Sequence, residues 1–318
     1  MRYRIILNAE AGRAPGSPRG TTPAELRAAF AAAGVEAEIE EVTPGELGPR
    51  VHAAARTRPD ALVVGGGDGT IRTAAALLVD TGIPLGVLPL GTLNHFAKDL
   101  GVPTDPTAAA AALAGGHVRS IDVGEVNGEV FINNCSLGAY AEAVRRRNGL
   151  QSQGTHGKWR AMLRASFAAF RRLRRLPFEL RLTSGGGPPP PVRHVRTPLL
   201  VVANNRYSGQ LLDHSLRERL DAGELWLYTV RARRHLAVLR LVLRALFRRL
   251  DEMAALEAEP AVGLEATCRS ADVPVALDGE VMPLHSPFTF RIRPGALRVI
   301  SPVSKPAGAP APPLRASG

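Results

Sequence analysis

A glycine-rich turn that directly follows a short apolar run places the strongest constraint on what this chain can fold into. Residues 61–64 are apolar, Gly65-Gly66-Gly67-Asp68-Gly69-Thr70 follows, and a helical pattern resumes over residues 71–81. Short continuous apolar runs are typical of parallel strands that are covered on both faces. A strand, a glycine-rich turn and a helix in this order predict one unit of a parallel α/β sheet.

The same alternation of strand and helix signals runs through the first 120 residues. Thr22 and Pro23 provide an N-cap and a first-turn proline for a helix that Gly34 closes. A second helix is expected at residues 46–58. Further strands are expected at residues 3–7, 37–42 and 84–88. We therefore predict an α/β N-terminal domain with a doubly wound, mostly parallel sheet.

The pattern changes after about residue 120. Asn127-Gly128 separates two strand-like runs, residues 119–126 and 129–133, and this dipeptide suits the type I′ turn of a hairpin. Further strands are expected at residues 178–183, 199–203, 225–230, 262–268, 273–277 and 288–292. The second part is therefore predicted to be mostly antiparallel, with two inserted basic helices. The Pro/Ala-rich residues 302–318 are predicted to form a disordered tail.

The charge of the chain favours an anionic partner. Among its 318 residues, 40 Lys and Arg stand against 29 Asp and Glu, which gives a formal net charge of +11. Such a balance suits a nucleic acid, a nucleotide or an acidic membrane surface. Nucleic acid is not expected, because aromatic residues make up only 5% and no nucleic-acid-binding motif is recognised. Cys135 and Cys268 lack metal-ligand spacing, which argues against a disulfide scaffold or structural zinc and fits a reducing cytosol.

Two basic stretches suggest how the chain could meet a membrane. No uncharged apolar run approaches the roughly 18 residues needed to cross a bilayer, and the N-terminus does not fit a signal peptide. Residues 158–175 and 233–250 each combine an apolar stripe at helical spacing with arginines on the other side. One interpretation is that the apolar stripes face the core of the domain and the arginines face solvent. Alternatively, the helices can lie on an anionic membrane, where each basic residue contributes about 1 kcal/mol.

The glycine-rich turn carries the strongest signal for chemistry. It has no GK[ST] sequence, and Thr70 stands where a GxGxxG fingerprint needs its last glycine. Glycines at the end of a strand let backbone N–H groups approach phosphate, and the next helix adds a favourable dipole. A carboxylate at Asp68 beside bound phosphates fits an intervening Mg²⁺, held directly or through water. The alternative is a plain turn in which Asp68 is a cap.

Two further motifs are weak when taken alone. PLGTLNHFAKDLG, residues 89–101, follows the next predicted strand at the same sheet edge, where Thr92 and Asn94 can contact a nucleotide. Taken alone, a helix cap with Gly91 in the turn explains this motif better. His95 and Asp99, four residues apart, are predicted to be a surface pair. Asp278-Gly279-Glu280 is, by itself, a hairpin turn.

The glycine-rich turn at residues 65–70, the motif at residues 89–101 and Asp278-Gly279-Glu280 follow one another along the chain. Together and in this order they resemble the diacylglycerol kinase catalytic family, most closely its bacterial lipid-kinase branch. The run from Asn8 to Gly12 looks like the Asn-Pro-x-Ser/Ala-Gly loop of that family. The resemblance covers residues 1 to about 301. It implies a nucleotide-binding catalytic domain at 1–125, a β-sandwich-like lipid-substrate domain at 126–301, and an active site in the cleft between them.

The resemblance also implies a mechanism. ATP and Mg²⁺ are the expected cofactors, with Asp68 near the metal and Glu280 as general base on the hydroxyl of a membrane lipid. The product would be a phospholipid such as phosphatidic acid. The protein is then expected in the cytoplasm, peripherally attached to the inner face of the membrane, and its oligomeric state is left open. The residues expected to contact the nucleotide or its phosphates are Asn8, Ala9, Glu10, Ala11, Gly12, Arg13, Thr43, Gly66, Gly67, Asp68, Gly69, Thr70, Ile71, Arg72, Thr92 and Asn94.

Two alternatives stay open, and departures from the family pattern favour the second of them. Ala9 replaces a proline, and Arg72 replaces an asparagine or glutamate. The stretch from Arg219 to Glu224 resembles one that holds a structural Mg²⁺ in some members, but Ala222 replaces a carboxylate, so no structural metal is predicted there. One alternative is an NAD kinase-like enzyme, which would share the glycine-rich turn. The other is a non-catalytic, membrane-binding relative.

Overall fold

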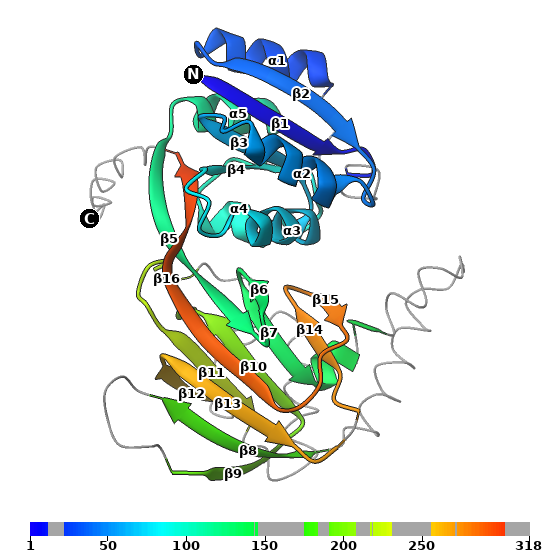
Figure 1. Ribbon diagram of the computed structural model, residues 1–318, viewed down its shortest axis with the longest axis vertical. Coiled ribbons are helices and arrows are strands. Elements are labelled where there is room, and N and C mark those ends of the chain that lie inside the picture. Colours follow the sequence, from blue (N-terminus) through cyan, green and yellow to red (C-terminus); the bar gives the residue numbers. More distant parts are fainter. Residues whose placement is uncertain are drawn as a thin grey trace, which may run out of the picture.

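The computed structural model describes residues 1–11, 22–142, 144–145, 175–183, 191–207, 217, 219–230, 256–270 and 272–302. Its described part has two regions, an α/β region and an antiparallel β region, stacked along the long axis (Figure 1). The basic helices predicted at residues 158–175 and 233–250 and the tail predicted at residues 302–318 lie outside the described residues, except for Arg175 and Pro302. Among the described residues, no helix has the length and apolar character needed to cross a membrane.

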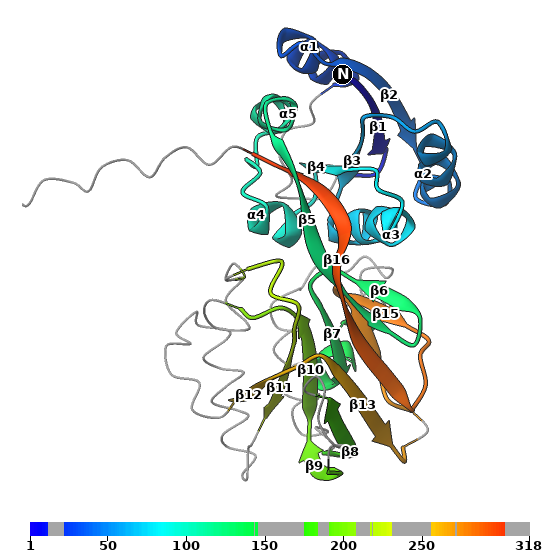
Figure 2. The same ribbon diagram turned by 60° about the vertical axis from the view of Figure 1, so that its left-hand side comes forward.

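The α/β region is a parallel sheet covered by helices. Its strands lie in the order β2-β1-β3-β4, and every pair among them is parallel. Helices α1 and α5 pack against each other, as do α2 and α3, and the two pairs lie on opposite sides of the sheet (Figure 2). Its elements are β1 (Arg2–Asn8), α1 (Pro23–Ala32), β2 (Glu36–Val42), α2 (Leu47–Arg56), β3 (Ala61–Gly66), α3 (Asp68–Leu78), β4 (Leu85–Pro89), α4 (His95–Asp99) and α5 (Pro106–Ala114).

Local sequence explains these elements. All residues of β3 and β4 are buried, as expected for apolar strands covered on both faces. At the start of α1, the Thr22 hydroxyl accepts from the Glu25 N–H while the Glu25 carboxylate accepts from the Thr22 N–H, a capping box followed by Pro23. The predicted doubly wound sheet is confirmed.

The β region packs two sheets around a second core. One of them has the order β12-β11-β10-β7-β14-β15 and is antiparallel throughout. The sheet that faces it is built around β16. On one side of β16 lie β13, β8 and β9 in this order, and on the other side β5 pairs with β16 and β6 pairs with β5. The strands are β5 (His117–Val126), β6 (Glu129–Phe131), β7 (Asn134–Gly138), β8 (Leu176–Thr183), β9 (Arg193–Thr197), β10 (Leu199–Asn204), β11 (Leu225–Val230), β12 (Leu256–Ala261), β13 (Gly263–Cys268), β14 (Val275–Leu277), β15 (Glu280–Met282) and β16 (Phe288–Ser301).

Two long strands, β5 and β16, pass from one region into the other (Figures 1 and 2). Phe288 and Phe290 of β16 belong to the core of the β region, whereas Leu297 and Val299 belong to the core of the α/β region. Val299 also pairs with Leu85 of β4, which extends the parallel sheet. The strand expected at residues 288–292 is therefore longer, and the α/β core is not contiguous in sequence.

The glycine-rich turn is shorter than the sequence indicates. Gly65 and Gly66 complete β3, and the helix expected from residue 71 begins at Asp68. Gly67, with φ −85° and ψ 178°, is the N-cap. Asp68, Gly69 and Thr70 therefore form the first turn of α3 rather than part of a loop, and this placement sets the geometry of the site.

Candidate active site

The glycine-rich turn and the loop after β4 pack backbone against backbone. A Cβ atom on Gly91 would lie 2.5 Å from the Gly67 Cα atom, and one on Gly65 would lie 2.6 Å from the Leu7 side chain. The Leu90 N–H donates to the Gly66 carbonyl at 3.1 Å. Glycine is required at Gly91 because a side chain there would push the two loops apart, and at Gly65 because a side chain would collide with Leu7 of β1.

The N-terminus of α3 forms a cradle with a carboxylate beside it. Gly67 has no side chain that could cap the helix, so the first-turn N–H groups are available to a ligand. Asp68 is half-buried, and its Oδ1 accepts from the Phe96 N–H of α4 at 3.5 Å. Backbone donors next to a carboxylate suit phosphates with a bridging Mg²⁺, so the residues present fit these groups.

The loop from Asn8 to Ala11 lies beside this cradle. Asn8 Nδ2 donates to Thr70 Oγ1 at 2.9 Å, and Asn8 Oδ1 accepts from the Glu10 N–H at 3.0 Å. The Ala9 N–H donates to the Val42 carbonyl at the end of β2. The structure thus brings this loop to the first turn of α3. Gly12 and Arg13 lie outside the described residues.

Two of the predicted nucleotide contacts, Thr43 and Thr92, are exposed, whereas Asn94 is buried. Thr43 donates from both its N–H and its hydroxyl to Glu46 Oε2. Asn94 has φ 51°; its Oδ1 accepts from the Gly91 N–H at 3.0 Å, and its Nδ2 donates to the Gly91 carbonyl at 2.7 Å. Its amide group is used within its own loop, so Asn94 shapes the loop instead of offering the free polar group that the sequence indicates.

Glu280 reaches the cradle from the other region of the protein. It begins β15, and its Oε2 accepts from Arg72 Nη2 of α3 at 3.0 Å. A Cβ atom on Gly69 would lie 1.9 Å from Glu280 Oε1, so the missing side chain makes room for the carboxylate. Arg72 is largely buried, and its Nε lacks a hydrogen-bond partner. A carboxylate, a guanidinium and a helix N-terminus therefore meet at one place.

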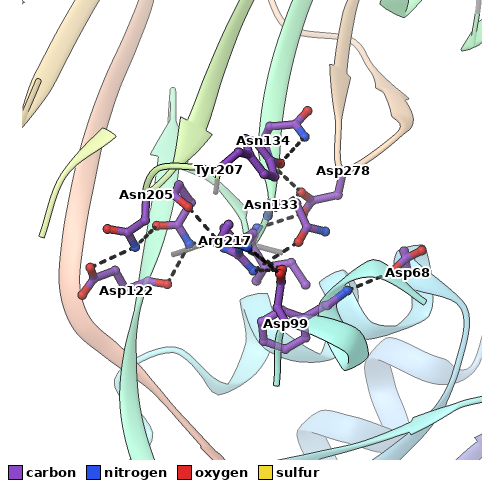
Figure 3. Close-up of polar contacts among 12 residues, drawn as sticks. Asp68, Asp99, Asp122, Asn133, Asn134, Asn205, Tyr207, Arg217 and Asp278 are labelled. Carbon is purple, nitrogen blue, oxygen red and sulfur yellow. Dashed lines mark hydrogen bonds and ion pairs between the residues drawn. The ribbon is translucent and has the colours of Figure 1, made fainter. Parts of the chain in front are cut away.

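Asp278 holds the hairpin that carries Glu280 (Figure 3). Its Oδ2 accepts from the Ile132 N–H at 2.9 Å, and its Oδ1 accepts from the N–H groups of Asn133 and Asn134 at 2.7 and 3.0 Å. Burial raises the pKa of Asp278 to about 6, against the opposing effect of the three N–H donors and of Arg72. Asp278 has a positive φ of 48°, which Asp tolerates in a turn.

Sequence reasoning missed a buried ion pair at the junction of the two regions. Asp99 was predicted to be a surface residue, but its side chain is only 6% exposed and is bonded to Arg217, whose side chain is 0% exposed. The prediction was wrong because it considered only neighbours on the same helix, while the partner is 118 residues away. Nothing in the sequence separates Arg217 from the other basic residues of a chain that has 40 of them.

The stretch at residues 219–224 is held by hydrogen bonds. Arg219 Nε donates to Asp221 Oδ1 at 3.0 Å, and the Gly223 N–H donates to Asp122 Oδ2 at 2.7 Å (Figure 3 shows Asp122). Asp122 also accepts from the side chain of Asn205. Across the described ranges, no three His, Cys, Asp or Glu side chains are grouped to hold a metal ion.

The fold and the glycine-rich turn define the class of domain. Residues 2–126 match the family model of the diacylglycerol kinase catalytic domain, which is the family that the motifs of the chain resemble. A diacylglycerol kinase of Mycobacterium tuberculosis is 35% identical over 153 residues, which are 46% of this chain and 49% of the relative. One from Bacillus subtilis is 37% identical over 145 residues, 44% of this chain and 47% of the relative. The chain thus spans about half the length of the curated relatives that it matches.

The likeness in fold extends over both regions. A crystal structure of a diacylglycerol kinase from Bacillus anthracis covers 94% of this chain and 96% of its own chain, with a TM-score of 0.65 and 19% identity. At this level of identity the comparison speaks for the fold alone. It includes the antiparallel region that carries Glu280.

Proposed function

We propose that this protein is a lipid kinase that uses ATP and Mg²⁺ to phosphorylate a hydroxyl group of a diacylglycerol-like membrane lipid. The product would be a phospholipid such as phosphatidic acid. The observation that carries the proposal is the position of the Glu280 carboxylate against Gly69, in the first turn of α3. The match of residues 2–126 to the diacylglycerol kinase catalytic domain supports the substrate class.

The α/β region would hold the nucleotide. The N–H groups of the first turn of α3 and the loop from Asn8 to Ala11 would cradle the phosphates, and Asp68 would hold Mg²⁺, directly or through water. When bound, ATP and Mg²⁺ supply the phosphoryl group and neutralise part of its charge. The task left to the protein is to place the acceptor hydroxyl in line with that group.

Glu280 would accept the proton of the lipid hydroxyl. For this role, one carboxylate oxygen must come within about 2.6–3.2 Å of the hydroxyl oxygen. Arg72 holds Oε2 and leaves Oε1 toward Gly69. The guanidinium of Arg72, with its unpartnered Nε, would also stabilise negative charge on the transferring group.

The location of the substrate requires contact with a membrane surface. The net charge of +11 favours an anionic leaflet. The predicted basic helices at residues 158–175 and 233–250 are the segments that we propose for this contact. The protein would then be cytoplasmic and bound peripherally to the inner face of the membrane.

The test is phosphoryl transfer from radiolabelled ATP, with Mg²⁺, to mixed micelles that contain a panel of lipids, with NAD as a soluble acceptor. Glu280→Gln is the test variant. Glu265→Gln is the matched control, because Glu265 is a partly exposed glutamate on β13 that pairs with Arg181. We expect label in a lipid with wild type and control but not with Glu280→Gln. Label in NAD alone would instead support a nucleotide kinase, and ATP binding without transfer to any acceptor would support a non-catalytic relative.

A further inference from the structure

We infer that Asp99 and Arg217 are a positioning pair that sets the distance between the nucleotide-binding cradle and Glu280. The inference rests on the proposed function and concerns residues that do not touch the reacting groups. Arg217 Nε and Nη2 donate to Asp99 Oδ2 at 2.9 and 2.7 Å, and the Arg217 N–H donates to Asp99 Oδ1 at 3.0 Å. Three charge-assisted bonds within a buried pair fix the two groups in orientation as well as in distance.

Asp99 connects the pair to the cradle. It is the last residue of α4, and the Phe96 N–H in the first turn of that helix donates to Asp68. The Arg217 guanidinium also lies over the Phe96 ring, 5.9 Å from its centroid. A shift of Arg217 would therefore act on α4 and, through it, on the carboxylate proposed to hold the metal.

Arg217 connects the pair to the hairpin that carries Glu280. Its Nη1 donates to the Ile132 carbonyl, and its Nη2 donates to Asn133 Oδ1 at 3.3 Å. The N–H groups of the same two residues donate to Asp278, two residues before Glu280 (Figure 3). One arginine thus binds both the helix next to Asp68 and the segment that anchors Asp278.

Two of the ion pairs that join elements of the α/β region to the β region differ in burial. Asp99 and Arg217 are 6% and 0% exposed, whereas the Glu280 side chain, paired with Arg72, is 49% exposed. A half-exposed carboxylate can exchange its partner for a substrate, but a fully buried pair loses too much when one member is left uncompensated. Asp99–Arg217 is therefore the permanent link, and Arg72–Glu280 is the link that substrate can replace.

The test uses two variants of the full chain. Asp99→Leu/Arg217→Met removes both charges together, which avoids an unpaired buried charge. Arg217→Lys keeps the charge but lacks the fork that binds several partners. The matched control, Arg181→Met/Glu265→Leu, removes an exposed ion pair between β8 and β13. Thermal unfolding of each variant shows whether it is folded. If the double variant does not fold, the inference is tested with Arg217→Lys alone.

Two measurements on the folded variants distinguish positioning from a merely structural role. We expect kcat for lipid phosphorylation to fall about 10²-fold, the effect of a displacement near 1 Å. KM for ATP should change by a much smaller factor, because the pair reaches the cradle only through Asp68 and does not contact the first-turn N–H groups of α3 or the loop from Asn8 to Ala11. Spin labels at His52→Cys and Arg196→Cys, both exposed, should report a broader or shifted distance than in the wild type. The two native cysteines are buried and would not react.

Wild-type kcat and an unchanged label distance in a folded variant would overturn the inference. The distance measurement does not depend on catalysis. If the wild type phosphorylates no lipid, the proposed function fails while the distance still tests the pair.

Discussion

At position 69, the absence of a side chain determines where Glu280 can lie. We expect Gly69→Ala to reduce lipid phosphorylation at least about tenfold, because the new Cβ atom would meet Glu280 Oε1 at 1.9 Å and Cδ at 2.7 Å. Stability should hold, since the displaced atoms end a flexible chain and alanine favours a helix by about 1 kcal/mol. Kinetics and urea unfolding check both effects.

Gly48→Ala is the matched control for this variant. Gly48 lies in α2, and nothing lies within 4 Å of the position of its added Cβ atom. It should leave activity unchanged. Equal activity of Gly69→Ala and the wild type would contradict the placement of Glu280.

The buried carboxyl of Asp278 makes stability depend on pH. Its folded-state pKa of about 6 lies above the ordinary value of 3.8, so the folded protein binds more protons between these values. The contribution of Asp278 to the free energy of unfolding is therefore full below about pH 4 and falls as pH rises to about 6, by an amount on the order of 2–3 kcal/mol. Urea unfolding at pH 4 and pH 7 should show a smaller decrease for Asp278→Asn than for the wild type. An identical decrease in both proteins would exclude this role.

The residues that the sequence predicted best are those whose partners are close along the chain or whose motif is long. Asp68 and the glycines of its turn follow from a strand, a turn and a helix in direct succession. Arg217 was missed because its partners, Asp99 and Ile132, are 118 and 85 residues away. The hydrogen bonds that Asn94 makes within its own loop could not be predicted, because a pattern of polar residues does not reveal them.

Among the elements, the contact between the two loops at the sheet edge is the most sensitive. A Cβ atom on Gly91 would lie 2.5 Å from the Gly67 Cα atom, and a backbone atom cannot yield as a side chain can. We expect Gly91→Ala to cost about 1–3 kcal/mol of stability and to weaken ATP binding in a calorimetric titration. Gly45→Ala, with nothing within 4 Å of the added atom, should do neither. Unchanged ATP affinity in Gly91→Ala would show that this loop contact does not shape the cradle.

Strands that consist of continuous apolar runs were predicted from the sequence, and short or polar strands were not. β3 and β4 are buried throughout and read as apolar runs. β9 has the sequence RHVRT and β12 contains Pro260, so neither resembles a strand by composition. Both end a sheet, where pairing on one side suffices. Strand β15 has only three residues and is defined by its pairing with β14.

At the scale of the whole molecule, β16 makes the two regions depend on each other. Leu297, Val299 and Ile300 are buried in the α/β core although they come near the end of the described chain. Local patterns predicted the strand at residues 288–292 but not its extension, because the pairing of Val299 with Leu85 joins residues more than 200 positions apart. The sequence therefore predicted both regions but not how they share a strand.

This shared strand predicts that the α/β region cannot fold alone. A fragment of residues 1–126 would leave the side of β4 and the core around Leu297 open. It should show no cooperative thermal unfolding by circular dichroism. In the full chain, Leu297→Ala should cost about 2–5 kcal/mol, as for other fully buried leucines. A fragment that unfolds cooperatively and has the far-UV circular dichroism spectrum of a folded α/β domain would contradict the assignment of β16 to this core.

The central claim is that Glu280 is the base of a phosphoryl transfer made at the N-terminus of α3. Single-turnover transfer of labelled phosphate from ATP to the lipid acceptor, at saturating ATP and with ATP affinity measured separately by calorimetry, tests this claim most directly. We expect Glu280→Gln to bind ATP as the wild type does and to transfer phosphate about 10²–10⁴-fold more slowly. Transfer by Glu280→Gln at the wild-type rate, with unchanged ATP affinity, would contradict the claim.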